Sequence, residues 1–173
     1  MKAGVIGTGY VGLMQGTGLA EIGHDVVCID NDAEKVARLQ SGDIPIFEPG
    51  LTEYVLRNTR EGRLRFSTDK REALGASAIF LALPTPQGGD GAADLSYVLS
   101  VADELGDLMQ DDDPFRVIVN KSTVPVGTSE KVRAAIAAKT NAPFAVVSNP
   151  EFLREGSAVG DFMKPDRIII GSN

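Results

Sequence analysis

The sequence has 173 residues, of which 43% are hydrophobic and 24% are charged, and it carries a net charge of −7. This length and this balance predict one globular domain rather than a disordered segment. The acidic balance argues against nucleic acid and against an anionic membrane as partners, because no excess of Lys and Arg supplies a basic face.

The chain opens with an apolar run at residues 3–6, the motif GTGYVG at residues 7–12 and a predicted helix at residues 10–22. The first glycine of such a motif allows a tight turn, the second lets a pyrophosphate approach the backbone, and the third lets the helix lie close to the strand. The phosphates would lie on the free N–H groups at the positive end of that helix. A strand-to-helix turn without a ligand is the alternative. The residues expected at the cofactor are Gly7, Gly9, Tyr10, Val11 and Gly12.

A second apolar run at residues 26–29 ends in Asp30. An acid at the end of the second strand can accept hydrogen bonds from a ribose diol and repels a 2′-phosphate, so the sequence favours NAD over NADP. Lys35 could weaken this preference, or it could face solvent on a predicted helix at residues 33–40. Cys28 has no His or Lys beside it, and we interpret it as a core residue rather than a nucleophile.

Strand and helix patterns alternate through the rest of the chain. The predicted strands are residues 64–67, 78–83, 117–119, 144–147 and 167–170, and the run at 78–83 is typical of a strand that is covered on both faces. Helices are expected at residues 52–60, in a short turn that ends near 76, from a cap at Asp94 or Ser96 to residue 108, and after a cap at Thr128 or Ser129. The alternation predicts a Rossmann-like, doubly wound α/β fold, with a mainly parallel sheet in the order 3-2-1-4-5-6 and helices on both faces.

Three polar and proline-rich segments follow predicted strands, at residues 84–86, 122–128 and 149–155. Ligands bind at the carboxyl ends of parallel strands, so these loops predict one site. The site would hold the hydroxyl of Thr123, the amine of Lys121 and the carboxylates of Glu151 and Glu155, which share a face if a helical turn begins at Phe152. A carboxylate there could take the proton of an alcohol, or Glu151 could be an ordinary acid at a helix start.

Two further features bear on metals and on the compartment. We interpret the acidic run at residues 111–113 as a solvated loop rather than a metal site. A single cysteine cannot form an internal disulfide, the first residues do not resemble a signal peptide, and no apolar run reaches the ~20 residues of a membrane helix. We therefore expect a cytoplasmic protein without a metal.

A set of motifs narrows the function. In chain order they are VIGTGYVGL, IFEPGL, GRLRFSTD, KSTVPVGT, NPEFLREGSAVGDF and PDRIIIG. In this order and spacing they resemble the amino-terminal NAD-binding domain of the UDP-glucose/GDP-mannose dehydrogenase family, over essentially the whole chain. The segment KSTVPVGT and the residue Gly156 resemble its UDP-glucose branch.

The resemblance implies an oxidoreductase that converts the C6 alcohol of UDP-glucose to the carboxylate of UDP-glucuronate with two NAD, through aldehyde, thiohemiacetal and thioester stages. It implies that Asp30 and Lys35 contact the adenosine ribose, that Pro84, Thr85 and Thr123 lie along the cofactor, and that Thr123 and Glu151 hold the water of proton transfer and hydrolysis. The UDP-sugar would be lined by Glu151, Phe152, Leu153, Arg154 and Glu155, with Glu155 near the sugar and a catalytic role expected for Thr123, Glu151 and Glu155.

The resemblance also implies what this sequence lacks. The nucleophilic cysteine of the family, its central helical domain and its carboxy-terminal UDP-binding domain have no counterpart in residues 1–173. We therefore expect a polypeptide that binds NAD without turnover, from a family whose members form homodimers. A UDP-N-acetylhexosamine dehydrogenase of the same family and a non-catalytic NAD-binding module are the alternatives.

Overall fold

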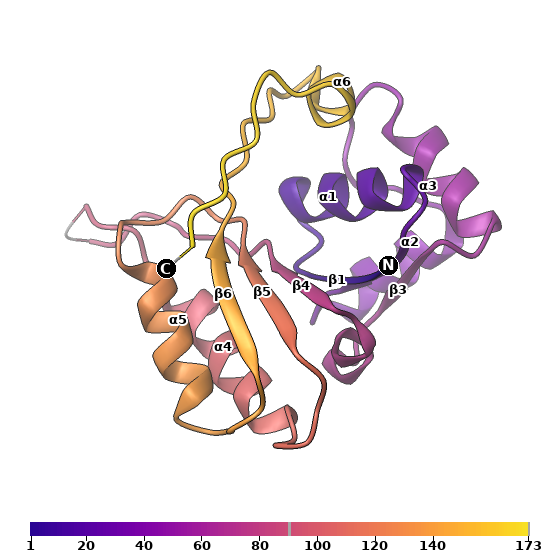
Figure 1. Ribbon diagram of the computed structural model, residues 1–173. Helices are drawn as coiled ribbons and strands as arrows, with labels where there is room; N and C mark the ends of the chain where they lie inside the picture. The colour runs from indigo at the N-terminus through magenta and orange to yellow at the C-terminus, as the bar shows by residue number, and fades with distance from the viewer. Residues whose placement is uncertain (90, 173) are drawn as a thin grey trace.

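A computed structural model describes residues 1–89 and 91–172 and contains a six-stranded parallel sheet in the order β3-β2-β1-β4-β5-β6 (Figure 1). The predicted strand order and fold class are confirmed. The strands are β1 (Lys2–Ile6), β2 (Asp25–Ile29), β3 (Leu64–Ser67), β4 (Ala78–Leu81), β5 (Arg116–Asn120) and β6 (Phe144–Ser148). The helices are α1 (Tyr10–Glu21), α2 (Ala33–Ser41), α3 (Leu51–Arg60), the 3₁₀ helix η1 (Lys70–Gly75), α4 (Ser96–Leu108), α5 (Thr128–Ala137) and α6 (Ala158–Met163).

The strand register brings the carboxyl ends of the strands to one edge. Ile6, the last residue of β1, lies beside Ile29 of β2 and Leu81 of β4. Leu81 lies beside Asn120 of β5, and Asn120 lies beside Ser148 of β6. The loops that follow these strands therefore start side by side along one edge of the sheet.

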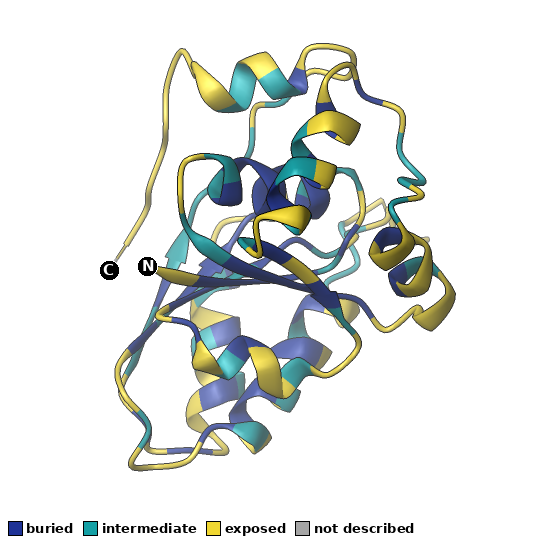
Figure 2. Ribbon diagram, turned by 90° about the vertical axis from the view of Figure 1, so that its right-hand side faces the viewer, coloured by how far each residue is buried: buried dark blue, intermediate teal, exposed yellow. Residues whose placement is uncertain are grey.

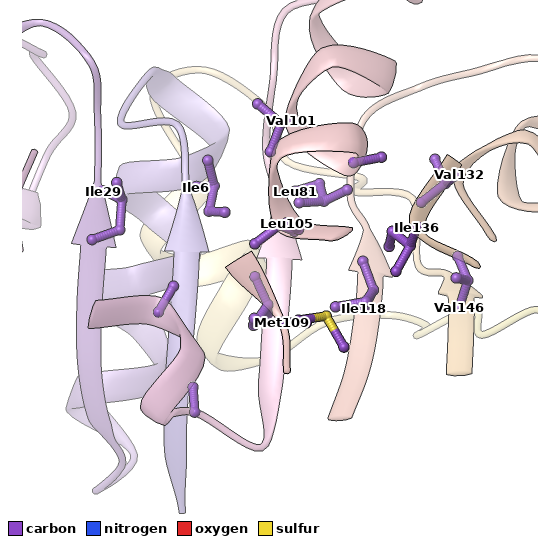
Figure 3. Close-up of a cluster of buried hydrophobic side chains, with 14 of the residues drawn as sticks. Ile6, Ile29, Leu81, Val101, Leu105, Met109, Ile118, Val132, Ile136 and Val146 are labelled. Carbon is purple, nitrogen blue, oxygen red and sulfur yellow. The ribbon is translucent and has the colours of Figure 1, made fainter. Parts of the chain in front are cut away.

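One face of the sheet is covered by η1, α4 and α5. Apolar side chains from these elements pack on alternate residues of the strands, as expected for a period of two along a strand (Figure 3). Leu81, Leu105, Ile118 and Ile136 are among the fully buried members of this cluster. It forms the larger of the two cores.

The opposite face carries α1, α2, α3 and α6 over the first strands, where a second cluster includes Val5, Cys28 and Leu51. Helix α1 lies close to the sheet, because a Cβ on Gly16 would stand only 2.2 Å from the Cys28 sulfur. Cys28 is fully buried, and burial raises the pKa of its thiol to about 12. The interpretation of Cys28 as a core residue is confirmed.

The same face is open over β5 and β6. Val117 and Val147 are only half-buried there. In the described part of the chain, no helix packs on this part of the sheet (Figure 1). Phe80 of β4 is likewise half-buried. The expectation that the strand at residues 78–83 is covered on both faces is nevertheless met at Ala78 and Ala82, which are 7% and 9% exposed on the same face, and it fails in part at Phe80, which packs half-buried against the second cluster.

Other local predictions fail for identifiable reasons. The run at residues 167–170 is no strand, since its isoleucines are exposed and a single bridge joins the following Gly171 to Ser148 (Figure 2). The short helix near residue 76 is the 3₁₀ helix η1. Helix α5 has Gly127 as its N-cap, with a φ of 88°, in place of Thr128 or Ser129, because the Thr128 hydroxyl donates to the carbonyl of Pro125. Helix α4 has Leu95 as its N-cap in place of Asp94 or Ser96, although the Asp94 side chain accepts from the Ser96 N–H.

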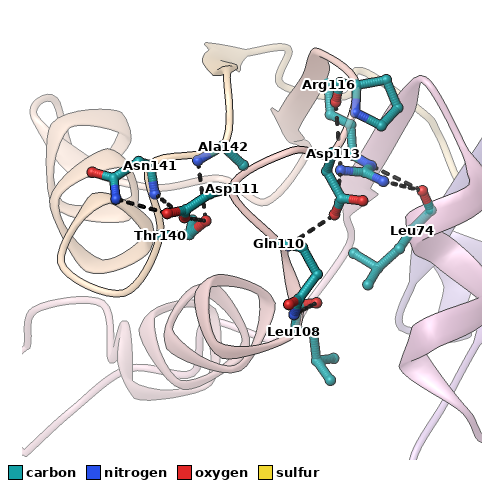
Figure 4. A network of polar contacts seen from close by, with 10 residues as sticks. Leu74, Leu108, Gln110, Asp111, Asp113, Arg116, Thr140, Asn141 and Ala142 are labelled. Atoms are coloured by element: carbon teal, nitrogen blue, oxygen red, sulfur yellow. Dashed lines mark hydrogen bonds and ion pairs between the residues drawn. The ribbon is translucent and has the colours of Figure 1, made fainter.

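A polar network holds the edge of the sheet opposite the aligned carboxyl ends (Figure 4). Arg116, only 3% exposed, donates to the carbonyl of Leu74 and pairs with Asp113, at 3.0 Å between Nη1 and Oδ2. Asp111 accepts hydrogen bonds from Thr140 and Asn141. The acidic run at residues 111–113 thus fastens loops together, and no metal-binding cluster occurs among the described residues.

None of the helices in residues 1–89 and 91–172 has the length and hydrophobicity to cross a bilayer.

Candidate functional site

The glycine turn follows β1 at the edge where the strands end. Its backbone closes on β2, because the Gly7 N–H donates to the Ile29 carbonyl at 2.8 Å. The first hydrogen bond of α1 runs from the Leu13 N–H to the Gly9 carbonyl, so the N–H groups of residues 10–12 are left free of the helix ladder. These donors and the helix dipole provide a site for an anion.

The glycines of the turn meet different surroundings. A Cβ on Gly12 would stand 1.9 Å from the Gly7 carbonyl oxygen, so no other residue fits there. A Cβ on Gly9 would meet no heavy atom within 4 Å. Gly12 thus permits the contact between helix and strand, whereas Gly9 leaves space in which a ligand can approach the backbone.

Asp30 lies directly after β2 and is 7% exposed. Burial alone would raise the pKa of its carboxyl group, but hydrogen bonds from Thr8, Asp32 and Lys35 lower it on balance. The Thr8 N–H and hydroxyl both donate to Oδ2, at 2.8 and 2.7 Å, and the Lys35 ammonium reaches the same atom at 3.0 Å. Among the described residues, Oδ1 accepts only the Asp32 N–H, at 3.1 Å, and so keeps the capacity to accept from a ligand.

A cavity of about 580 Å³ runs along this edge. Its volume lies within the range of small-molecule sites. Most of the residues predicted at the cofactor line it, namely Gly7, Gly9, Tyr10, Val11, Asp30, Lys35, Pro84, Thr85 and Thr123, and Glu151 lines it too. Gly12 lies behind the turn rather than in the lining.

The loops after β4 and β5 are fastened to each other beside this cavity. The Ser122 hydroxyl donates to the Leu83 carbonyl at 2.7 Å and accepts from the Leu83 N–H at 3.1 Å. The Thr85 hydroxyl donates to the Thr123 carbonyl at 3.2 Å. Two segments about 40 residues apart in sequence therefore form one wall of the site, and the Thr123 hydroxyl is left out of these contacts.

A second, larger hollow of about 1050 Å³ lies on the open face of β4, β5 and β6, and we call it the face groove. Phe152, Leu153 and Arg154 line it, together with Lys121 and Glu151. Lys121 and Glu151 also line the cavity at the strand ends. The two hollows thus meet at this pair of charged residues.

Lys121 is 8% exposed, and its ammonium group donates to the Asn149 side-chain oxygen at 3.3 Å. Burial lowers the pKa of Lys121, while the negative charge of Glu151 acts in the opposite direction. Glu151 itself accepts the Leu153 N–H at 2.5 Å through Oε2. An amine and a carboxylate therefore lie together at the junction of the two hollows.

The segment after Glu151 does not form the expected helical turn. Residues 151–154 are irregular, and α6 begins only at Ala158, so Glu151 and Glu155 do not share a helical face. Glu155 is exposed and lines neither hollow. Arg154 pairs with Asp161, at 2.6 Å between Nη2 and Oδ1. The roles predicted for Glu155 and Arg154 stay predictions.

Thr8 and Glu48 are buried polar residues that the sequence did not predict at the site. Thr8 holds the carboxylate of Asp30, and Glu48, 4% exposed, accepts the Tyr10 hydroxyl and the Gly156 N–H at 2.7 Å and the Ala158 N–H at 2.8 Å. Burial would raise the pKa of Glu48, but these hydrogen bonds lower it. A lone acid inside the apolar, proline-rich segment at residues 44–51 was the available signal, because a buried charge requires partners.

The Tyr10 side chain faces this acid as well as the cavity. Burial and the Glu48 carboxylate raise the pKa of the Tyr10 hydroxyl, so it stays a donor. Through Glu48 it links the start of α1 to the turn before α6, across more than a hundred positions of sequence. The glycine turn and the segment at residues 151–158 therefore share one buried anchor.

The cavity has the parts that NAD requires in this fold. Free N–H groups at the start of α1 suit the pyrophosphate, the open space at Gly9 admits it, and Asp30 offers an acceptor where the adenosine ribose lies in such folds. The residues present therefore fit this cofactor.

Known proteins resemble the chain over its whole length. A model of the UDP-glucose/GDP-mannose dehydrogenase family, NAD binding domain, matches residues 1–173. The UDP-glucose 6-dehydrogenase of Rhizobium meliloti (strain 1021) is 53% identical over 175 residues, which span 99% of this chain and 39% of that protein.

Solved structures also resemble the chain over nearly its whole length. A UDP-glucose dehydrogenase from the hyperthermophilic archaeon Pyrobaculum islandicum aligns with a TM-score of 0.92 at 44% identity, over 99% of this chain and 40% of that one. A GDP-mannose dehydrogenase from Pseudomonas aeruginosa aligns with a TM-score of 0.91 at 32% identity, over 100% and 41%. The chain thus spans well under half of the length of each relative. It belongs to the UDP-glucose/GDP-mannose dehydrogenase family and corresponds to that family's NAD binding domain.

Proposed function

We propose that this chain is the cofactor-binding domain of an enzyme that oxidises the C6 alcohol of UDP-glucose to UDP-glucuronate with two NAD. The observation that carries the proposal is the junction of the cavity at the strand ends with the face groove, at Lys121 and Glu151. A dehydrogenase needs a cofactor and an alcohol in contact, and this junction is where two ligands can meet.

In this proposal each segment at the carboxyl edge of the sheet binds one part of the cofactor. The start of α1 binds the pyrophosphate, Asp30 and Lys35 bind the adenosine ribose, and Pro84 and Thr85 line the cofactor. When bound, NAD serves as the two-electron acceptor of the oxidation. Thr123 would hold its nicotinamide half, because Asp30 and Thr123 follow strands on opposite sides of β1 and β4.

The chemistry on the protein side is a proton transfer. The Glu151 carboxylate takes the proton of the sugar hydroxyl, directly or through a water that it holds together with Thr123. Glu151 is half-buried between the two hollows, within reach of a ligand in either. Phe152, Leu153, Arg154 and Glu155 contact the UDP-sugar in this assignment.

UDP-glucose is favoured over GDP-mannose by similarity. The R. meliloti protein, named for UDP-glucose, is 53% identical to this chain, whereas the P. aeruginosa GDP-mannose dehydrogenase is 32% identical. Residues 1–173 then work as the NAD-binding domain, while the nucleophilic cysteine, the central helices, the UDP-binding domain and the dimer contacts belong to parts of the enzyme outside this sequence.

Two measurements test the proposal. Calorimetry on the 173-residue chain is expected to show NAD binding that is tighter than NADP binding, with no NADH formed from UDP-glucose. A chimera, in which this chain replaces the matching part of the R. meliloti enzyme, is expected to form NADH with UDP-glucose and to lose that activity on Glu151→Gln. Absence of NAD binding would overturn the proposal, and activity only with a UDP-N-acetylhexosamine would favour that substrate class instead.

A further inference from the structure

Lys121 and Glu151 lie at the junction of the two hollows, and no ion pair joins them among the described residues, unlike Asp30 and Lys35 along the same cavity. The Lys121 residue is 8% exposed, and the hydrogen bonds of the described residues give its ammonium group one partner, the Asn149 side-chain oxygen at 3.3 Å. An ammonium group carries three donors. Two of them are therefore free to face a ligand, and the positive charge is poorly screened by water.

The strand order fixes which part of a bound dinucleotide meets this charge. Asp30 follows β2 and Lys121 follows β5, on opposite sides of the central pair β1 and β4. With the adenosine ribose at Asp30 and the pyrophosphate at α1, the nicotinamide ring lies at the end of the cavity that Lys121 and Glu151 line. This step rests on the function proposed above.

The two oxidation states of the cofactor differ in one charge at that ring. The ring is a cation in NAD and neutral in NADH, while the adenosine half is the same in both. We propose that Lys121 determines which oxidation state the cavity prefers: its ammonium group repels the oxidised ring and thereby favours NADH, and the carboxylate of Glu151 acts in the opposite sense. Lys121 is thus a specificity-determining residue for the redox form of the cofactor.

The size of the effect follows from Coulomb's law. Unit charges several ångströms apart near a protein surface interact strongly enough to change a binding ratio by about tenfold. A tenfold change in the ratio of the NAD and NADH dissociation constants corresponds to about 30 mV in the potential of a bound two-electron couple.

Measuring both dissociation constants on the 173-residue chain tests the proposal. Lys121→Met keeps the length of the side chain and removes the charge, so the ratio Kd(NAD)/Kd(NADH) is expected to fall about tenfold. Lys121→Arg keeps the charge and is expected to keep the ratio near the wild-type value. Glu151→Gln leaves the ammonium unopposed and is expected to raise the ratio.

Lys35→Met is the matched control, because Lys35 lies at the adenosine end, where the two cofactors are identical. It is expected to weaken both cofactors equally and to leave the ratio unchanged. An unchanged ratio in Lys121→Met, or a ratio that moves equally in Lys35→Met, would overturn the inference. A wild-type chain that binds neither cofactor would instead overturn the proposed function, so the two failures are distinguishable.

Discussion

The two halves of the sheet differ in what covers the face that carries α1. Over β1 and β2 this face is closed, and Val5 and Cys28 are 0% exposed. Over β5 and β6 the same face is open, and Val117 and Val147 line the face groove. Both halves nevertheless consist of equally apolar strands. An apolar run therefore indicates that a strand can be buried, and not that an element covers it.

The closed half depends on very close packing of α1 against the sheet. Gly12→Ala is expected to disturb this packing more than any other proposed variant. The added Cβ would stand 1.9 Å from the Gly7 oxygen and 2.8 Å from the Gly7 carbonyl carbon, which are backbone atoms that cannot move aside. We expect the free energy of unfolding to fall by about 3 kcal/mol, measured by urea denaturation.

Gly9→Ala is the control for this variant. Its backbone has a φ of −68°, and no heavy atom lies within 4 Å of the new Cβ. Stability should therefore stay nearly unchanged, while NAD affinity falls because the methyl group projects into the cavity. Equal losses of stability in Gly12→Ala and Gly9→Ala would contradict the close packing of α1 in this half.

Adjacent valines of β6 compare the two faces directly. Val146 is 3% exposed in the core under α4 and α5, and Val147 lies on the face groove. We expect Val146→Ala to cost about 2.5 kcal/mol and Val147→Ala less than about 1 kcal/mol, since only the first leaves a cavity. Denaturant midpoints measure both, and similar costs would mean that the open face is covered in solution.

Glu48 connects α6 to the start of α1, at the boundary between the two halves. Its hydrogen bonds lower the pKa of the carboxyl group from the ordinary 4.5, so its stabilising contribution is complete above that pH and is lost as the pH falls through the lower, folded-state pKa. Glu48→Gln should lower the Tm by roughly 5 °C at neutral pH, and the difference from wild type should shrink on acidification.

The control for Glu48 is Glu53→Gln on the exposed side of α3. Glu53 has a side chain that is 77% exposed and only a 3.7 Å contact with Arg57, so its removal should leave the Tm unchanged. If the Tm difference between Glu48→Gln and wild type does not vary with pH, then the shape of the Glu48 side chain, and not its charge, fastens α6 to α1.

Asp30 follows β2 of the closed half, and its replacement should cost less free energy than Gly12→Ala or Val146→Ala. Asp30→Asn should weaken NAD binding by about tenfold and narrow the preference for NAD over NADP, because charged hydrogen bonds to the ribose are lost. Calorimetry with both cofactors measures this. An unchanged NAD affinity would place the adenosine end of the cofactor elsewhere.

Much of the site was predictable because it is encoded locally. The GTGYVG turn, Asp30 after the second strand and the polar loops after the fourth, fifth and sixth strands each follow from neighbours in sequence, and the cavity at the strand ends brings them together. The roles of Thr8 and Glu48 were not predictable in this way, since their partners lie tens of residues away and depend on the fold.

The failed predictions have the same origin. The run at residues 167–170 has the composition of a strand but finds no ladder to join, and the polar segment at residues 151–155 stays irregular although its spacing suits a helix. Propensity decides neither case, because strands need a paired edge and short helices need a covered face.

The sequence alone predicts the α/β class, the strand order, the position of the glycine turn and the family, because each depends on residue types at short range and on a regular alternation of patterns. The folded chain is needed to see that Lys121 and Glu151 line both hollows, that Glu48 anchors both the cofactor turn and α6, and that one face of β5 and β6 is open. These features depend on distances between residues far apart in the chain, and such distances exist only once the strands have aligned their ends.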